Sequence, residues 1–318
     1  MTIPEYSRRM NRVLDYIDQH LDEQLDLDDL AAVANFSPYH FHRVFSAWLG
    51  ETPGNYFHRR RLAVGATRLT TRSSDSVLLV ALSVGFGSGE AFARAFKRQF
   101  NCTPTAWRAQ TPQRWAEQLA LAKSRNIAQQ RNLDQGESNL DQVFCKDFCN
   151  HGGSDPIFEE HQMEVRLIDI QATKVAYLRI IGSHGAAVAD FWTRVFNPWM
   201  SARGLDGRAC YGIIHDDPYL TPLSQCRYDC CVEVPDSFVA TGKAVLTTLP
   251  GGRYAAARFK GTAAMIANAW TEMFREWLPA SGLRSDSRPF FNRYPANLRL
   301  DPKTGVFECE LYLPVCPL

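Results

Sequence analysis

Apolar side chains recur at helical spacing along the first hundred residues, and residues that begin or end helices separate these runs. Met10, Val13, Ile17 and Leu21 lie three or four positions apart, so they predict one amphipathic helix. Asp28 is placed to cap a second, shorter helix. The N-terminal region is therefore expected to be helical throughout.

A third helix begins after a short turn. Asn35, a residue that tolerates positive φ, ends the second helix, and Ser37-Pro38 pairs a capping residue with the residue favoured at the first helical position. Phe41 and Phe45 lie on one face of the new helix. A short helix, a tight turn and a second helix make up a helix-turn-helix unit.

The same unit returns 51 residues later. The matched pairs are Ser37 and Ser88, Phe41 and Phe92, Arg43 and Arg94, Phe45 and Phe96, Thr52 and Thr103, and Pro53 and Pro104. Identity at so many capping and core positions indicates two copies of one unit. We therefore expect an all-α, double helix-turn-helix domain over residues 1–110.

The pattern changes after residue 110. Residues 111–160 can begin with a helical tail. Residues 129–141 are rich in Gln, Asn, Asp and Arg, and the run HGGSDP (151–156) cannot be regular structure, so this segment is predicted to be a linker. Strands are predicted at 165–170, 174–181, 229–234, 244–249, 254–259 and 307–313, with amphipathic helices at 186–203 and 263–280.

A second internal repeat, offset by about 78 residues, lies in this later region. It matches Trp192 with Trp270 and Gly204 with Gly282. We therefore expect residues 161–318 to form an α+β domain of two duplicated modules with a cleft between them. The chain as a whole is predicted to be multi-domain.

The overall charge of +1 conceals a local bias. Residues 1–40 hold three arginines against eight acidic side chains, whereas residues 41–110 hold ten Lys and Arg against three acidic side chains. A basic stretch in a neutral chain is the electrostatic footprint of phosphate contact, although a solvated helix face gives the same count. The candidates for phosphate neutralisation are Arg59, Arg60, Arg61, Arg68, Arg72 and Arg98.

Other classes of protein fit the composition poorly. Nine irregularly spaced cysteines indicate reduced thiols in the cytoplasm, and no apolar run is long enough to cross a membrane. Cys145, Cys149 and His151, with Asp147 or Asp155, do not have a common zinc spacing. His184 and His215 are interpreted as turn residues. We expect no metal, no cofactor and no catalytic residue.

The outward faces of the second helix in each unit suit DNA reading. With the apolar side turned inward, the opposite faces present Tyr39, His42 and Arg43 in the first unit and Glu90, Arg94 and Lys97 in the second. Exposed arginine beside hydrogen-bonding groups fits major-groove recognition, in which Arg contacts guanine edges. The alternative is a helical protein-interaction module with a solvated basic face, which the duplication on a basic segment disfavours.

The runs VALSVGFGS (80–88), FARAFK (92–97), TP (103–104) and WR (107–108) resemble the signature of AraC/XylS regulators. The resemblance covers about residues 8–108 and implies two recognition helices in successive major-groove segments of promoter DNA. It implies base contacts by Tyr39, His42 and Arg43, and by Gly89, Glu90 and Arg94. The full set of expected DNA contacts is Tyr39, His42, Arg43, Arg60, Ser88, Glu90, Arg94 and Lys97. Gly89 lacks a side chain and Glu90 repels phosphate, so the second helix should discriminate less.

Residues 211–218, 227–232 and 310–315, with the internal repeat, resemble the GyrI-like effector-binding domain over residues 162–318. The resemblance implies a cleft that binds small, often aromatic or cationic, molecules. Glu310 lies in a strand whose alternation puts Glu308, Glu310 and Tyr312 on one face. Because a carboxylate among aromatic rings attracts cations, the expected effector contacts are Glu310, Trp192, Tyr211, Trp270, Phe290 and Tyr312.

Together these features predict a ligand-responsive transcriptional activator that is not an enzyme, with RNA polymerase as a further partner. Two alternatives remain for the C-terminal domain. Some stand-alone relatives of the GyrI-like domain hydrolyse small molecules, which would make Glu310 a general base. The domain could instead act by protein contact alone, with its aromatic side chains filling the core.

Overall fold

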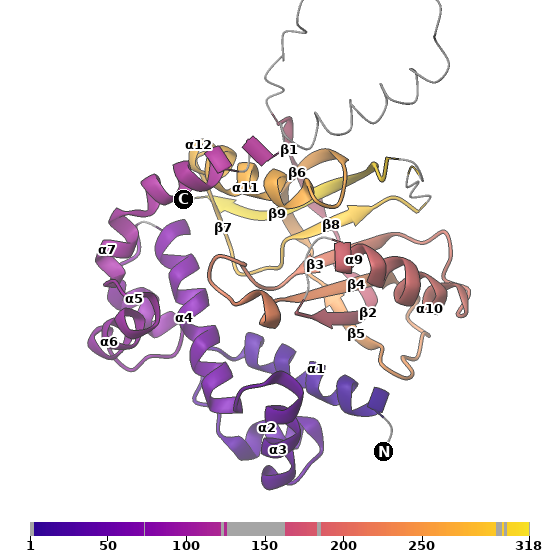
Figure 1. Ribbon diagram of the computed structural model, residues 1–318, viewed down its shortest axis with the longest axis horizontal. Coiled ribbons are helices and arrows are strands. Elements are labelled where there is room, and N and C mark those ends of the chain that lie inside the picture. Colours follow the sequence, from indigo (N-terminus) through magenta and orange to yellow (C-terminus); the bar gives the residue numbers. More distant parts are fainter. Residues whose placement is uncertain are drawn as a thin grey trace, which may run out of the picture.

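The computed structural model describes residues 3–72, 74–121, 124–125, 163–182, 186–296, 301 and 304–317. The helices of the first part run along one side of a β-sheet formed by the second part (Figure 1). None of the helices that the structure describes has the length and hydrophobicity needed to span a lipid bilayer.

The N-terminal part contains two helix-turn-helix units joined by one long helix. Its elements are α1 (Ile3–Gln19), α2 (Leu27–Ala34), α3 (Pro38–Leu49), α4 (Pro53–Thr71), α5 (Val77–Ser83), α6 (Gly89–Phe100) and α7 (Pro104–Ala109). Ser37 and Ser88 cap α3 and α6 through their hydroxyls, and Thr52 and Thr103 cap the helices that follow. The predicted duplication is therefore confirmed at its capping positions.

Two details of the turns complete this picture. The cap of α2 is Asp26, in a capping box with Asp29, and not the predicted Asp28. Asn35 and Asn101 both adopt positive φ, at 52° and 57°, as the sequence indicated. Gly85 also has positive φ, and an added Cβ would lie 2.5 Å from the Leu21 carbonyl oxygen, so only glycine fits this turn.

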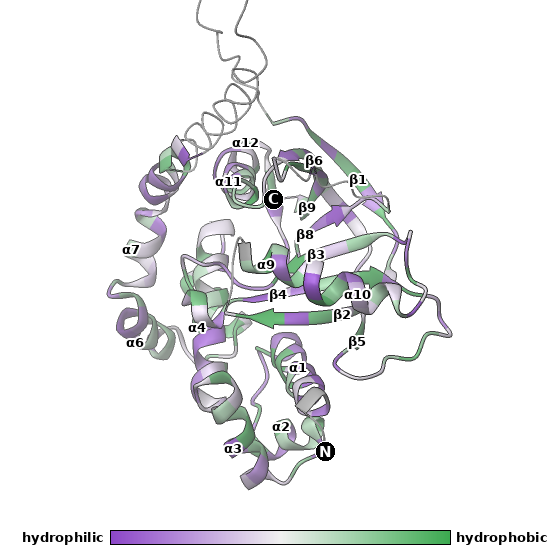
Figure 2. Cartoon of the chain, turned by 45° about the vertical axis from the view of Figure 1, so that its right-hand side comes forward, coloured by the Kyte–Doolittle hydropathy of each residue, from purple (hydrophilic) through white to green (hydrophobic). Residues whose placement is uncertain are grey.

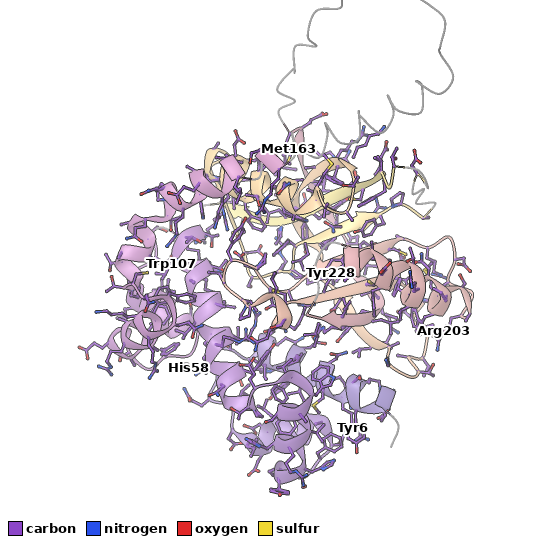
Figure 3. The ribbon with its side chains drawn as sticks, viewed as in Figure 1. Tyr6, His58, Trp107, Met163, Arg203 and Tyr228 are labelled. Carbon is purple, nitrogen blue, oxygen red and sulfur yellow. The ribbon has the colours of Figure 1, made fainter. Side chains whose placement is uncertain are left out.

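Helix α4 takes part in both helical cores. Its first half places Tyr56 in the core built by α1, α2 and α3. Its second half places Leu62, Ala66 and Leu69 in the core of α5 and α6. Trp107 of α7 packs edge-on against Phe96 in this second core (Figure 3). The two units therefore share one rigid connector.

Helical structure continues past α7. Residues 111–121 are helical, as the sequence indicated for the start of the 111–160 segment, and they pack against the C-terminal domain. Trp115 lies under the guanidinium of Arg275, with the Arg275 Cζ 4.9 Å from the ring centre. This helical tail therefore makes a direct contact between the candidate DNA-binding domain and the C-terminal domain.

Within the described residues, nine strands form the C-terminal sheet, all paired antiparallel. They are β1 (Val165–Ile170), β2 (Thr173–Ile181), β3 (Cys210–Ile214), β4 (Arg227–Glu233), β5 (Val245–Leu249), β6 (Gly252–Gly261), β7 (Leu283–Ser285), β8 (Phe291–Tyr294) and β9 (Phe307–Pro317). The order is β1-β6-β9-β8-β3-β4-β2-β5, with β7 on β9. All six predicted strands are present, and β3, β7 and β8 were not predicted.

The strand order confirms two duplicated modules. Read from either edge toward the centre, β1-β6-β9-β8 matches β5-β2-β4-β3, which is the order expected for a pseudo-twofold arrangement. Each module lends its first strand to the other, because β1 pairs with β6 and β5 pairs with β2. The two modules share one continuous sheet.

Helices cover one face of this sheet. They are α9 (Ala186–Phe191), η1 (Trp192–Phe196) and α10 (Asn197–Ser201) in the first module, and α11 (Ile266–Glu272), η3 (Met273–Trp277) and α12 (Leu278–Ala280) in the second. Their apolar side chains pack on one set of strand residues. A second cluster, with Tyr211, Tyr254, Phe291 and Tyr312, lies on the other side, called the opposite face below.

Candidate nucleic-acid interface and effector site

Helix α3 presents the expected reading residues to solvent. Its inner side buries Phe41 and Phe45, which turns Tyr39, His42 and Arg43 outward. Tyr39 is 74% exposed, which is a large value for an aromatic side chain, and it takes no part in the helical core. The Arg43 guanidinium lies 5.7 Å from the Tyr39 ring centre, so the ring steadies the arginine without covering it.

Helix α6 repeats this arrangement with different chemistry. Glu90, Arg94 and Lys97 are exposed, while Phe92 and Phe96 are fully buried. The Ser88 hydroxyl accepts the Ala91 amide hydrogen 3.1 Å away, so this side chain is used as a cap. Both α3 and α6 lie on the outer side of the helical part, away from the sheet (Figure 1).

Arg60 does not lie on the DNA-facing surface where the sequence predicted it. It is only 7% exposed, and its Nε lies 2.9 Å from Asp18 and its Nη1 2.7 Å from Asp216. The expectation of a phosphate contact is wrong for this conformation, because both carboxylates already neutralise the guanidinium. Charge counting along the chain could not distinguish this buried arginine from exposed ones.

Three neighbouring arginines also pair with groups of the protein itself. Arg59 pairs with Glu51 at 2.6 Å, Arg61 donates to the Leu21 carbonyl at 2.7 Å, and Arg68 donates to the Ser83 carbonyl. Arg98, by contrast, is exposed. The positive charge free for phosphate is therefore smaller than the sequence count indicated.

The first polar contact between the domains consists of two arginines and two aspartates. Asp18 of α1 accepts from Arg60 of α4 and, at 2.8 Å, from Arg227 of β4. Asp216 accepts from the same two arginines, at 2.7 and 2.8 Å. Burial alone would raise the pKa of Asp216, but the charges of Arg227 and Arg60 hold it well below its ordinary value. We call these four residues the inner charge cluster.

A second contact lies beside it. Asp15 of α1 accepts from the Tyr177 hydroxyl and, at 2.7 Å, from Arg179, both of β2. Arg179 also pairs with Asp229 at 2.6 Å, and His215 lies 2.6 Å from the same carboxylate. His215 is therefore part of an ionic network and not merely a turn residue. Figure 2 shows α1 directly beside β2, at a hydrophilic band of the strand.

A third contact involves the helical tail. Arg275 of η3 donates to Gln118 at 2.8 Å, stacks on Trp115 and lies 3.5 Å from Asp217. None of these three contacts was predicted from the sequence. A signal existed in the acidic surplus of residues 1–40, since Asp15 and Asp18 supply the carboxylates that face the buried arginines of the sheet.

Glu310 lies on the opposite face of the sheet, among basic side chains. Its oxygens accept from Arg166 of β1, from Arg293 of β8 at 3.2 Å and from the Tyr312 hydroxyl at 3.0 Å. Tyr211 lies on the same face, directly across from Arg293. The expectation of a carboxylate free to attract a cation is therefore not met, because two guanidinium groups already pair with it.

The expected aromatic contacts are divided between the two faces. Trp192, Trp270 and Phe290 pack in the helix-covered core, where Trp270 Nε1 donates to Asn292 at 2.8 Å. Trp192 donates to the hydroxyl of Tyr228, which lies in the interior of this domain (Figure 3). The prediction that all six residues line a single pocket is therefore wrong.

The aromatic partner of Tyr312 is the residue next to the one predicted. Phe291 stacks on Tyr312 with ring centres 5.0 Å apart, whereas Phe290 contacts Trp270 on the other side. Adjacent residues of a strand point to opposite faces, so an error of one position changes the face.

The remaining candidates hold no assembled site in the described part of the chain. Cys145, Asp147, Cys149, His151, Asp155 and His184 lie outside the described residues. The described cysteines are free thiols, and burial raises the pKa of Cys226 to about 12. No group of three metal-ligating side chains occurs among the residues that the structure covers.

Two family models match the chain. Residues 30–110 match a helix-turn-helix domain, and residues 163–315 match the GyrI-like small molecule binding domain. The regulatory protein SoxS of Escherichia coli is 33% identical over 93 residues, which are 29% of this chain and 86% of SoxS.

Two longer relatives match over a smaller share of their length. The transcriptional regulator Rob of Salmonella typhimurium is 41% identical over 98 residues, 30% of this chain and 33% of Rob. YbfP of Bacillus subtilis, an uncharacterized HTH-type transcriptional regulator, is 35% identical over 103 residues, 32% of this chain and 35% of YbfP. The chain thus spans about a third of the length of these two relatives.

Proposed function

The chain belongs to the AraC-type family of transcriptional regulators and carries a GyrI-like small-molecule binding domain, and from this we propose that it binds promoter DNA sequence-specifically and responds to a small-molecule effector. The observation that carries the proposal is the exposure of both reading faces while the two domains are docked. Tyr39, His42 and Arg43 would read one major-groove segment. Glu90, Arg94 and Lys97 would read the next.

The two reading helices differ in what they offer to DNA. Arg43 can donate two hydrogen bonds to a guanine edge, with His42 and Tyr39 beside it. Glu90 can accept from cytosine N4 but repels phosphates, so the second unit would contribute selectivity with less affinity. Ser88, which caps α6, would contact the phosphate backbone of the DNA, because the N-terminus of this helix is exposed.

The effector is proposed to bind the opposite face of the sheet around Glu310, Tyr211 and Tyr312. The rings of Tyr312 and Phe291 stack on each other at this face and are both buried. Arg166 and Arg293 flank the carboxylate, so a cationic effector would have to displace a guanidinium to reach it. An aromatic molecule with its own polar acceptors would keep those arginines in place.

The junction gives the effector a route to the DNA-binding domain. Arg179 and Arg227 belong to the same sheet face as Tyr211, through the register of β2, β4 and β3. A change in strand position at the effector site would alter the pairing of these arginines with Asp15 and Asp18. Effector binding would thus shift the balance between docked and undocked domains. We place this activity in the cytoplasm, with the protein acting as an activator that contacts RNA polymerase.

A salt series of DNA binding tests the DNA-binding half of this proposal. Selected promoter fragments and random DNA are compared with the full chain and with the Arg43→Ala and Arg94→Ala variants. We expect affinity to fall steeply with salt and each variant to lose about 1–3 kcal/mol of sequence-specific binding. If no fragment is preferred over random DNA and neither substitution matters, the function assigned to the helical domain is wrong.

The hydrolase alternative has no specific observation in its favour among the described residues. The Glu310 oxygens already accept from two arginines and a tyrosine, so the carboxylate is engaged before any water arrives. A turnover assay on the full chain would show whether this face performs chemistry.

A further inference from the structure

A cavity of about 390 Å³ lies at the junction of the two domains. Asn11 of α1 and Trp48 of α3 line it from the DNA-binding domain, and Leu178–Ile181 of β2, Val195 of η1 and Lys243 line it from the other. Its size falls in the range of small-molecule sites, roughly 300–1,000 Å³. None of its lining residues belongs to the Glu310 cluster.

One wall of the cavity is a strand edge. Strand β4 pairs with β2 over Val175–Ile181, but β5 pairs with it only over Thr173–Tyr177. Beyond Tyr177, no strand among the described residues pairs with the edge of β2 on the β5 side. A strand edge presents backbone N–H and C=O groups, so this wall can hydrogen-bond to a polar ligand group.

The charge of the lining is positive. Arg179 is neutralised by Asp15 and Asp229, whereas Lys243 is exposed and forms no ion pair with any described residue. No carboxylate lines the cavity. Asn11 is buried at 4% exposure, and its Oδ1 has no hydrogen-bond partner within the described structure.

Apart from Ser7 and Ser224, the rest of the lining is apolar. Trp48 and Leu49 at the end of α3 are joined by Ile180, Phe191 and Val195 across the cavity. Val195 is 42% exposed and lies at the rim of the cavity, where a ligand would cover it. The lining therefore combines a free cation, a strand edge and an apolar wall.

We propose that this junction cavity is a second small-molecule site, which takes an organic carboxylate with a compact aromatic or aliphatic body. The carboxylate pairs with Lys243 and the edge of β2, and the body packs between Trp48 and Phe191. Because the walls come from both domains, a molecule bound here stabilises the docked arrangement. Arg179 belongs both to the lining and to the contact with Asp15, so occupancy and docking are linked.

The test uses the full chain and two probes of the same shape and opposite charge, 4-phenylbutyrate and 4-phenylbutylamine, in calorimetric titrations. We expect the carboxylate to bind at least about tenfold more tightly than the amine. Lys243→Gln should weaken carboxylate binding by about tenfold, while the matched surface change Lys260→Gln leaves it unchanged. Val195→Trp, which fills the rim, should abolish binding.

Further variants separate this site from the proposed effector face. A phenylbutyrate binding event that is weakened by Lys243→Gln belongs to the junction, whereas a separate event that responds to Glu310→Gln belongs to the proposed effector face. Asp15→Ala combined with Asp18→Ala should weaken the junction event by loosening the contact between the domains. Lys243 is exposed, so its variant keeps the test valid even where the others fail to fold. The proposal is overturned by equal binding of both probes, by no saturable binding at millimolar phenylbutyrate, or by binding that responds to Glu310→Gln and not to Lys243→Gln.

Discussion

Arginine serves two different purposes in this chain. On α3 and α6, Arg43 and Arg94 extend into solvent with no ion-pair partner among the described residues. On α4, Arg60 lies between Asp18 and Asp216, and on the facing sheet Arg227 is completely buried. The same side chain is free for an external anion in one setting and paired with an internal one in the other.

Burial decides between these uses. An exposed guanidinium keeps its hydration and can exchange water for a base edge or a phosphate. A buried one must be fully paired, so its partners become part of the fold. The exposed residues of α3 and α6 are therefore free of constraints from the fold, whereas each member of the junction is fixed by the others.

Removing one carboxylate from the inner charge cluster gives the largest expected effect. Asp18→Ala leaves Arg227 and Arg60 to share Asp216, so we expect a loss of about 3 kcal/mol or more in the free energy of unfolding. Urea denaturation of the full chain measures it. The control is Asp169→Ala, which breaks an exposed pair with Arg253 and should cost under about 1 kcal/mol. Equal losses in the two variants would contradict the buried role.

Lowering the pH should destabilise the ion pairs between the domains before it affects the exposed faces of α3 and α6. Burial would raise the pKa values of Asp18 and Asp229, but the arginine charges facing them lower both below the ordinary value. A lowered folded-state pKa contributes stability above the unfolded value of about 3.9, and this stability is lost as the pH falls toward the folded value.

Each such carboxylate adds a slope of up to about 1.4 kcal/mol per pH unit below about pH 4.5. Unfolding free energies measured between pH 6 and pH 3.5 should therefore fall less steeply for Asp18→Asn than for the unmodified chain. Parallel slopes would mean that Asp18 has the same pKa in the folded and unfolded states.

Phosphate contacts can be sorted from internal ones by salt dependence. Arg98 is exposed on α6, so Arg98→Gln should reduce the slope of log affinity against log salt by about one. Arg59 is paired with Glu51, so Arg59→Gln should leave the slope unchanged. A fall of the slope with Arg59→Gln would show that this pair opens when DNA binds.

The smallest effect compares the helix ends of the two repeats. Gly50 ends α3 with φ of 80°, and Asn101 ends α6 at the matching position with φ of 57°. Glycine adopts this region without strain, so Asn101→Gly should stabilise the chain by about 0.5 kcal/mol. Thermal unfolding measures it, with Gly50→Asn expected to shift stability the other way. A lower unfolding temperature for Asn101→Gly would indicate a role for the Asn side chain.

Much of the fold could be predicted because its signals are local. Capping residues such as Ser37 and Ser88, and helical spacing of Phe41 and Phe45, are readable within a few positions. Strand β3 was missed because its residues 210–213 are all buried, so its sequence shows no alternation. Strand β8 has only four residues, too few for a period to show.

The sites were harder to predict because they depend on distant partners. Arg60 looks like any surface arginine until Asp216, 156 residues away, is placed beside it. Phe290 and Phe291 are indistinguishable in composition, and only the register of β8 against β9 assigns Phe291 to the Tyr312 side. Burial and register are properties of the assembled sheet.

The exchange of first strands between the two modules has a consequence for the ancestry of the domain. A single module would carry one strand that it cannot pair internally and one exposed edge, β2 or β6, in need of a strand. Two identical copies would satisfy each other by swapping that strand, as obligate dimers do. The present domain has the arrangement of such a dimer within one chain, so neither half is expected to fold when expressed by itself.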